Sequence, residues 1–231
     1  MDFIEGEILV FDKPYQWTSF DLVRKVRNSL TKRLHLKKLK VGHAGTLDPL
    51  ATGVLVICTG RATKQIDTLQ AQIKEYIATI EFGRTTPSFD LEKETDAVYP
   101  FAHITREALE QILQQFTGKS NQIPPLFSAK NLSGRRAYEF AREGSDMQLE
   151  AKPIEIYHLS IVSFQLPTVV VRVTCSKGTY IRSLARDLGV AMQSGACLTG
   201  LRRTRSGDYS VEEALTPEAF EQLLQSEGFV L

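Results

Sequence analysis

The segment Gly42–Gly53, with the sequence GHAGTLDPLATG, constrains the fold more than any other part of this chain. It places three glycines and one proline within a short stretch. Glycine adopts backbone conformations closed to other residues, and Pro49 fixes its own φ angle and biases Asp48 away from helix. We therefore predict a stiff, irregular loop here. Such a loop is a common place for a scaffold to present a catalytic group, and Asp48 is the candidate acid.

The composition is that of an ordinary globular protein. The 231 residues suit one large domain or a domain with a sizeable insertion. No run of about 18 apolar residues is present, so no membrane span is expected, and the acidic N-terminus lacks the apolar core of an export signal. The cysteines lack C-x-x-C spacing, which favours a reducing cytoplasm and argues against a structural zinc site. All three are expected to be buried: Cys58, Cys175 and Cys197.

The net charge of +1 hides an uneven distribution of charge along the sequence. Eight basic residues and no acid lie between Arg24 and Lys40, and a second basic cluster contains Arg202, Arg203 and Arg205. The acids concentrate in one central loop and near the C-terminus. Segregated charge can produce a locally positive surface on a nearly neutral protein, as phosphate binding requires. For the first basic run, a solvated helix face is the alternative interpretation.

The apolar patterns predict a mixed succession of strands and helices. Strands are expected at 8–11, 54–58, 76–82, 154–164, 168–175 and 200–207. Helices are expected from Thr18 or Ser19 to about Leu30, at 62–69, after Thr105, at 135–142, from 177 to about 192 and after Thr216. Because strands and helices do not alternate strictly, we predict an α+β fold with a largely antiparallel mixed sheet flanked by helices.

Residues 1–231 are treated as a single domain, since no internal repeat or low-complexity linker divides them. Residues 84–104 are polar and turn-rich, and we expect a mobile loop there. The first helix is expected to bury an apolar face formed by Phe20, Val23, Val26 and Leu30.

Several kinds of chemistry lack their usual motifs in this sequence. The four histidines form no H-x-x-x-H pair, and no phosphate-binding G-K-[ST] loop or dinucleotide fingerprint is present. A Ser-His-Asp hydrolase is not excluded by spacing, but its G-x-S-x-G elbow is missing. A metal-free, cofactor-free reaction centred on a carboxylate remains. Asp48 alone is weak support for it, because an aspartate in a glycine-rich loop is more often a turn or cap residue.

Three segments resemble the motifs of the TruB family of tRNA pseudouridine synthases. The segment 42–53 matches the pattern G-H-x-G-x-L-D-P-x-A-x-G, residues 74–78 (KEYIA) resemble the Tyr-x-Ala motif, and residues 175–182 (CSKGTYIR) resemble a third motif. They occur in family order, and the resemblance runs from about residue 8 to residue 215. It implies the pseudouridine synthase fold and an isomerase that needs no cofactor and no metal.

The resemblance implies specific catalytic residues. Asp48 would be the nucleophile or the base that begins cleavage of the glycosidic bond, after which the uracil detaches, rotates and rejoins its ribose through carbon. Arg182 would pair with Asp48, and an opposite charge would keep that carboxylate ionised. Tyr76 would stack on the base, and its hydroxyl could assist proton removal at carbon 5. Without the family context, a tyrosine on a strand is more often part of the core.

The resemblance also implies substrate-binding residues. His43 would stabilise the flipped-out uridine or fill the place it leaves, although a lone histidine more often serves a loop hydrogen bond. Tyr180 would contact the base or sugar, and Leu201 would pack against the uracil. Lys64 would meet the RNA backbone. Lys177 suits a phosphate by its charge and by its position before a predicted helix.

The expected partner is the T arm of tRNA, gripped by an insertion at about 120–152. Asn131 stands where relatives usually carry a lysine, for which Lys130 could compensate. The chain ends about one helix after the catalytic core, so we expect no C-terminal PUA-type domain. We expect a cytoplasmic monomer that modifies uridine 55.

Three alternatives remain open on the sequence. They are a pseudouridine synthase acting on another RNA, a tRNA-binding RNA chaperone, and an aspartate-dependent glycoside or nucleoside hydrolase. The hydrolase normally needs two carboxylates, and no second acid accompanies Asp48 in its loop.

Overall fold

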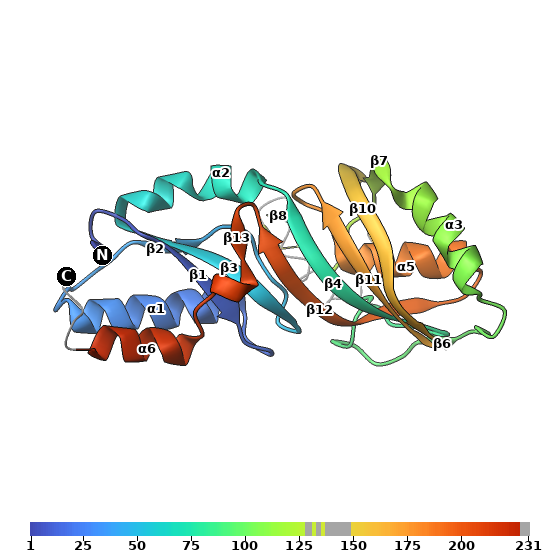
Figure 1. Ribbon diagram of the computed structural model, residues 1–231, viewed down its shortest axis with the longest axis horizontal. Coiled ribbons are helices and arrows are strands. Elements are labelled where there is room, and N and C mark those ends of the chain that lie inside the picture. Colours follow the sequence, from blue (N-terminus) through green and yellow to red (C-terminus); the bar gives the residue numbers. More distant parts are fainter. Residues whose placement is uncertain (128–130, 133–134, 137–148, 227–231) are drawn as a thin grey trace. The chain divides into compact units, whose positions relative to one another are not determined.

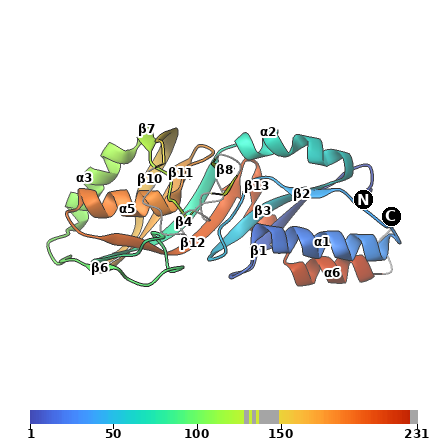
Figure 2. The same ribbon diagram turned by 180° about the vertical axis from the view of Figure 1, so that it is seen from behind.

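The computed structural model describes residues 1–127, 131–132, 135–136 and 149–226, and Figures 1 and 2 show its helices and strands. The chain forms two compact units. The first unit contains Met1–Tyr76 and Leu201–Leu231, and the second unit contains Ile77–Gly200. Helices and mostly antiparallel strands mix without strict alternation, so the expected α+β class is confirmed. The treatment of 1–231 as one domain stays a prediction.

The strands of the first unit surround β3 (Ala51–Thr59). β1 (Ile8–Lys13) and β2 (Val41–His43) pair with β3 antiparallel, whereas β12 (Ala196–Ser206) pairs with it in parallel from Leu201 onward. The short β13 (Tyr209–Ser210) extends β12 as a hairpin.

β3 is buried on both of its faces. Leu55 and Ile57 point into the cluster with α1, and the alternate residues Val54, Val56 and Cys58 point into a second cluster. That second cluster also holds residues of the 3₁₀ helix η1 (Gly60–Gln65) and of α2 (Ile66–Ala71). A strand covered on both sides is apolar at every position, which explains the continuous run predicted from the sequence.

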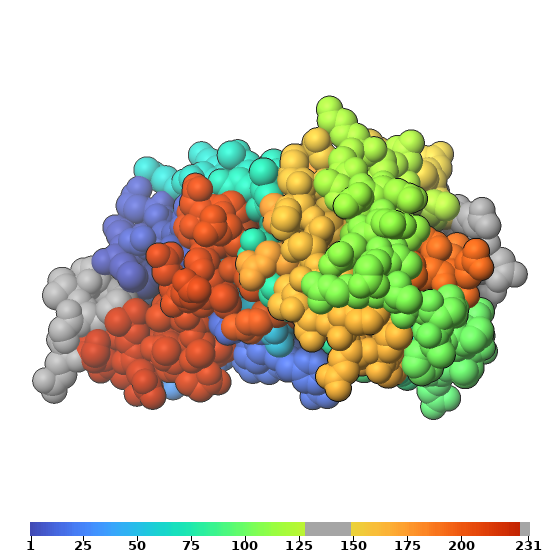
Figure 3. Space-filling view, turned by 45° about the vertical axis from the view of Figure 1, so that its right-hand side comes forward, coloured from blue at the N-terminus to red at the C-terminus, as the bar shows by residue number. Residues whose placement is uncertain are grey.

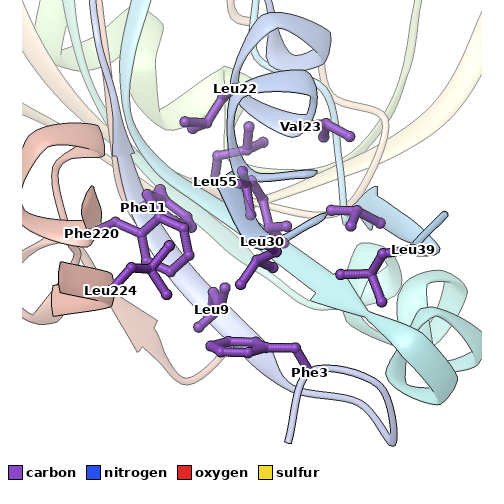
Figure 4. Packing of buried hydrophobic residues seen from close by; sticks show 13 residues of the cluster. Phe3, Leu9, Phe11, Leu22, Val23, Leu30, Leu39, Leu55, Phe220 and Leu224 are labelled. Atoms are coloured by element: carbon purple, nitrogen blue, oxygen red, sulfur yellow. The ribbon is translucent and has the colours of Figure 1, made fainter. Parts of the chain in front are cut away.

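Two helices lie side by side on one face of these strands, as Figures 1 and 2 both show. They are α1 (Ser19–Arg33) and α6 (Pro217–Gln225). Thr18 begins α1 with a capping box, and Thr216 caps α6 with proline at its first position, as predicted. Figure 4 shows their packing, in which the Phe11 and Phe220 rings meet edge to face at 5.2 Å.

The apolar face predicted for α1 is wrong at Phe20, which is 59% exposed. Leu22 is buried instead, together with Val23, Val26 and Leu30. In the first turn the inward position belongs to Ser19, whose hydroxyl binds the Leu47 backbone. A polar contact therefore replaces the apolar contact that periodicity alone suggested.

In the second unit, strands follow the order β4, β11, β10 and β7. β10 (Lys152–Gln165) and β11 (Thr168–Cys175) are antiparallel neighbours, so the strand pair predicted around Leu166–Pro167 is confirmed. β7 (Gly118–Gln122) pairs with β10, and β4 (Lys74–Phe82) begins in the first unit.

Two helices lie among the described residues of the second unit. α3 (Arg106–Phe116) is capped by Thr105 as predicted, and Figure 3 shows its side chains beside those of β10. α5 (Ile181–Ala191) follows β11 and buries an apolar face centred on Leu184 and Leu188. None of the helices in the described ranges has the length and apolar character of a membrane-spanning segment.

Two predictions about the second unit, one of a loop and one of a helix, differ from the structure. Within 84–104, β5 (Arg84–Thr85) pairs with β6 (Ala97–Val98), and Ser88 and Asp90 are buried, so this is not simply an exposed polar loop.

The second difference concerns the helix predicted at 135–142. Residues Arg135–Arg136 form a short strand, β9, paired with β8 (Asn131–Leu132). The remainder of that predicted helix, and Lys130, lie outside the described residues. The prediction is therefore wrong for Arg135 and Arg136, because periodicity along the chain does not reveal a strand partner.

Candidate active site

Asp48 lies in the connection between β2 and β3, as its glycine and proline content predicted. The Ala51 N–H donates to the Asp48 carbonyl at 3.0 Å, which closes a turn over Pro49. The Pro49 carbonyl in turn accepts from the Gln16 N–H at 2.9 Å. Asp48 is partly exposed, so its carboxylate sits on a fixed turn within reach of solvent.

The residue before Asp48 is held by the first turn of α1. The Leu47 N–H donates to Ser19 Oγ at 2.8 Å, and the Ser19 hydroxyl donates back to the Leu47 carbonyl at 3.0 Å. Both groups are buried. The backbone entering Asp48 is therefore fixed by a reciprocal pair of bonds that does not depend on solvent.

Lys13, at the end of β1, fixes the other side of the turn. Its buried Nζ donates to the carbonyls of Pro14 at 3.0 Å, Trp17 at 2.6 Å and Pro49 at 3.3 Å. Burial lowers the pKa of Lys13 to about 8, an effect that the nearby Asp48 carboxylate opposes. Lys13 thus brings a cation and three hydrogen bonds to the loop of Asp48.

Two residues of the second basic cluster, Arg202 and Arg203, bind groups of the first unit. Arg202 forms a two-bond pair with Asp12, at 2.6 Å and 3.1 Å. Arg203 is 1% exposed and donates to the carbonyls of Val54, Gly45 and Thr46. The expectation of a basic phosphate-binding cluster here is therefore wrong for Arg203, which is buried, and stays a prediction for Arg202, whose side chain is 42% exposed.

β3 approaches β12 closely at Gly53, the last residue of the segment 42–53 that contains Asp48. Gly53 has φ of 102°, and a Cβ placed on it would overlap the Arg203 backbone. We expect Gly53→Ala to lower the free energy of unfolding by at least about 3 kcal/mol, through left-handed strain plus displacement of β12.

Gly118→Ala is the matched control for this substitution. Its φ is 104°, but no atom of the described residues lies within 4 Å of an added Cβ. Gly118→Ala should lower the free energy of unfolding only through backbone strain at a positive φ, by about 1–2 kcal/mol. Urea denaturation of both variants measures the difference, and equal losses would show that the approach to β12 does not constrain Gly53.

Three more predicted site residues lie in the first unit. His43 ends β2, where burial lowers its pKa, the Arg203 charge lowers it further, and the Gly45 backbone acts in the opposite direction. Leu201 pairs in register with Ala51, just after the turn of Asp48. Tyr76 is buried near the start of β4. Thr204 of β12 bonds to Glu75, the neighbour of Tyr76, which ties β12 to that strand.

Lys64 lies farther away. It is exposed on η1, which follows the end of β3, whereas Asp48 precedes its beginning. A nine-residue strand is roughly 26 Å long from its first to its last residue at about 3.3 Å per residue. Lys64 is therefore placed for a contact remote from the Asp48 turn.

The other predicted site residues lie in the second unit, around the start of α5. Gln122 fixes this start, since its side-chain amide donates to the Tyr180 carbonyl at 3.1 Å and accepts from the Tyr180 N–H at 2.8 Å. Tyr180 is the N-terminal cap residue of α5, and Lys177 is exposed just before it.

Arg182 is buried in the first turn of α5. Its Nη1 donates to the Ser88 carbonyl at 3.2 Å, and its Nε lies 3.5 Å from Asp90 Oδ2, an ion-pair distance. The neighbouring Arg186 instead pairs with Asp187 at 2.7 Å in a half-exposed position. The pairing of Arg182 with Asp48 stays a prediction.

Asp90 was missed as a site residue by sequence reasoning. Its segment is polar, so nothing in the local pattern marks it as buried, yet it is 5% exposed. The buried carboxylate and the buried guanidinium offset part of the cost of burying each other's charge.

The basic run between Arg24 and Lys40 is divided between internal contacts and solvent. Lys25 pairs with Glu221 at 2.8 Å, and the Arg33 Nε donates to the Leu224 carbonyl at 2.9 Å, so both bind α6. The exposed lysines of this run remain available for phosphate: Lys32, Lys37, Lys38 and Lys40.

The chain is similar to known proteins over nearly its whole length. It is 58% identical over 225 residues to the tRNA pseudouridine synthase B of Parabacteroides distasonis, covering 97% of this chain and 96% of that protein. It is 57% identical over 227 residues to the tRNA pseudouridine synthase B of Phocaeicola vulgatus, and the match covers 98% of this chain and 97% of that protein.

Solved structures agree on the fold. A chain of a Cbf5–Nop10–Gar1 complex aligns with a TM-score of 0.72 at 27% identity, covering 96% of this chain and 55% of that one. A chain of an H/ACA RNP bound to a substrate RNA containing 2′-deoxyuridine aligns with a TM-score of 0.68 at 26% identity, and the match covers 96% of this chain and 54% of that one. This protein spans about half the length of those chains, and the expected pseudouridine synthase fold is confirmed.

Family models account for most of the sequence. Residues 32–181 match the N-terminal domain of the TruB family pseudouridylate synthase, and residues 182–228 match the tRNA pseudouridylate synthase B C-terminal domain. These matches contain the Asp48 loop and the Arg182 segment described above. The chain belongs to the TruB family of pseudouridine synthases.

Proposed function

We propose that this protein isomerises the T-loop uridine at position 55 of tRNA to pseudouridine. The observation that carries the proposal is Asp48, presented on a turn fixed by buried hydrogen bonds in a chain of this family. The relatives named tRNA pseudouridine synthase B cover nearly all of the chain, which supports tRNA as the substrate.

The reaction is an internal rearrangement of one nucleotide. Asp48 acts as nucleophile or base while the bond between ribose C1′ and uracil N1 breaks. The uracil rotates, C5 bonds to C1′, the C5 proton leaves, and N1 ends protonated, so no atoms are gained or lost. Holding the carboxylate in one orientation supplies much of the rate enhancement. The contacts of Ser19 and Lys13 support this by fixing the turn.

The remaining roles are proposals of the same kind. Tyr76 stacks on the base, Leu201 forms an apolar wall, and His43 supports the flipped-out state, for which its neutral form at pH 7 is suited. His43 and Leu201 lie on strands paired with β3, and Tyr76 lies on β4, which neighbours β12 in the sheet; this supports a shared site with Asp48.

Residues of the second unit and of η1 complete the proposed site. Arg182 is the charge partner of Asp48, and its burial beside Asp90 supports a fixed orientation. Tyr180 contacts the nucleotide, and Lys177 and Lys64 contact phosphates, which their exposure supports. The T arm is the part of tRNA that we expect to be bound.

Two further properties belong to the proposal. The three cysteines are free and buried, which supports a reducing, cytoplasmic setting. We also propose that the protein acts as a monomer.

Mapping of pseudouridine in tRNA incubated with the pure protein tests the substrate and the position together. A single new pseudouridine at position 55 is expected, and a substrate carrying cytidine there should stay unmodified. Modification at another position, or of ribosomal RNA in preference to tRNA, would overturn the substrate assignment. Faster tRNA refolding without any modification would favour the chaperone alternative.

The pH dependence of the reaction should report on Lys13. We expect the single-turnover rate to fall as the pH rises through about 8, because the deprotonated amine loses its charge next to Asp48 and one of its three donors. Unfolding is not the cause. With a folded-state pKa of about 8 against 10.5, the folded chain releases this proton first and gains relative stability between these values.

Lys13→Met is the control for this pH profile. It removes the titrating amine while keeping an unbranched side chain of similar length, so it should be slower throughout and lack the decline above pH 8. A decline that persists unchanged in the folded variant would assign the titration to another group.

A further inference from the structure

Arg203 is an unusual buried charge. Its side chain is 1% exposed and is the largest of the fully buried side chains. Its hydrogen bonds go to main-chain carbonyls, and the described residues place no carboxylate within ion-pair distance of it. Burial of a charge without a counter-charge is costly, so an ordinary core position would be better filled by an apolar residue.

The three acceptors explain what this charge holds together. Arg203 Nη2 donates to the Gly45 carbonyl at 3.1 Å and Nη1 to the Thr46 carbonyl at 3.4 Å, both before Asp48 in the loop. Its Nε donates to the Val54 carbonyl at 2.7 Å, after the loop has rejoined β3. One guanidinium therefore ties the two ends of the loop together, because its donors Nε, Nη1 and Nη2 are separate atoms spread over a planar fork, whereas a lysine at this position would have a single donor atom.

The backbone of Arg203 contributes as well. β12 pairs with β3 so that Arg203 lies opposite Gly53, and the missing side chain of Gly53 lets the two strands meet there. The same strand carries Leu201, two residues earlier. The position of the guanidinium is thus set by the strand register that also places Leu201 beside the loop.

We propose that Arg203 is a positioning residue for the reaction, which orients Asp48 by closing the ends of its loop from inside the protein. The assignment rests on the proposed function, because the effect on turnover needs the reaction of Asp48. The positive charge also lies close enough to lower the pKa of His43 and of Lys13. The guanidinium therefore adds a fixed positive potential at this site.

Arg202 provides a matched control on the same strand. It is also an arginine of the first unit, but its side chain is 42% exposed and its partners are Asp12 and Thr52 rather than the carbonyls of the loop. Removal of its charge should leave the orientation of Asp48 unchanged. A comparison of Arg203→Met with Arg202→Met thus separates the loop contacts from the general loss of an arginine.

The test measures single-turnover pseudouridine formation at saturating enzyme, together with tRNA affinity and thermal stability. For folded Arg203→Met we expect a rate at least about 100-fold lower, since misplacement of a reacting group by about 1 Å costs this much. Its affinity for tRNA should be unchanged. If folded Arg203→Met keeps the rate of Arg202→Met, the proposal is wrong.

Should Arg203→Met fail to fold, Arg203→Lys decides the question. It keeps the charge but replaces the three separate donor atoms Nε, Nη1 and Nη2 by one, so contacts to the two ends of the loop should be lost, the rate should also fall, and hydrogen exchange at the amides of Ala44 to Ala51 should be faster. A full rate in Arg203→Lys, or unchanged exchange, would overturn the proposal.

Two readouts separate this proposal from the proposed function. NMR titration of His43 should show its pKa rising in Arg203→Met but not in Arg202→Met, and neither this titration nor hydrogen exchange requires turnover. A wild-type protein that leaves uridine 55 unmodified would refute the proposed function alone. Unchanged exchange and an unchanged His43 titration would refute the role of Arg203 alone.

Discussion

Replacement of Asp48 by asparagine should abolish pseudouridine formation while tRNA binding and stability stay close to those of the wild type. Asparagine has the same size, and the turn of Asp48 is held through its main-chain carbonyl, which the substitution keeps. A neutral amide cannot act as nucleophile or base, so we expect a rate lower by more than about 10³-fold. Single-turnover assays, filter binding of tRNA and thermal denaturation measure the three quantities.

Asp21→Asn is a suitable control in the same unit. Asp21 belongs to the capping box of α1, where hydrogen bonds from Thr18 lower its pKa. Its replacement should affect stability slightly and turnover not at all. Ordinary turnover by Asp48→Asn would remove the basis of the functional assignment, whereas equal losses in both variants would point to a general structural effect.

The sequence was sufficient to predict the Asp48 loop because the relevant physics is local. Glycine and proline restrict their own backbone angles, so an irregular turn between two strands follows from Gly45, Pro49 and Gly53 without knowledge of the rest of the fold. The same holds for the caps Thr18 and Thr216, whose hydroxyls bind backbone amides within three residues.

The cations that hold this loop could not be assigned in the same way. Lysine and arginine are mostly exposed, so Arg203 was assigned to a basic surface cluster, and burial of Lys13 was not expected. Their acceptors are distant in sequence, since Lys13 and Pro49 are 36 residues apart and Arg203 and Gly45 are 158 apart. Only the tertiary fold brings these groups together.

Asp90 shows the same limit in the second unit. The polar residues of 84–104 suggested an exposed loop, because local composition does not reveal that α5 supplies a guanidinium to it. Phe20 is the converse case, an apolar residue left exposed because Ser19 takes the inward position for a hydrogen bond. In both cases one specific polar contact outweighed the hydrophobic pattern.

Asp90→Asn replaces a single oxygen by an amide nitrogen, yet we expect it to destabilise the fold strongly. It leaves the Arg182 guanidinium buried with less compensating charge, and loss of one partner of a buried pair costs roughly 3 kcal/mol or more. The asparagine carbonyl can still accept from the Glu92 N–H, so the local turn should survive. Turnover should also fall at least about tenfold, because Arg182 would lose its orientation.

Asp187→Asn tests whether burial is the cause. Asp187 pairs with Arg186 of the same helix at a shorter distance, 2.7 Å, but its side chain is 31% exposed. An exposed pair is worth less than about 1 kcal/mol, so the midpoint of urea denaturation should shift far less than for Asp90→Asn. If Asp90→Asn destabilises the protein no more than Asp187→Asn does, the buried contact of Asp90 does not hold Arg182 in place. The geometry of Arg182 would then have to come from the Ser88 carbonyl and its other contacts.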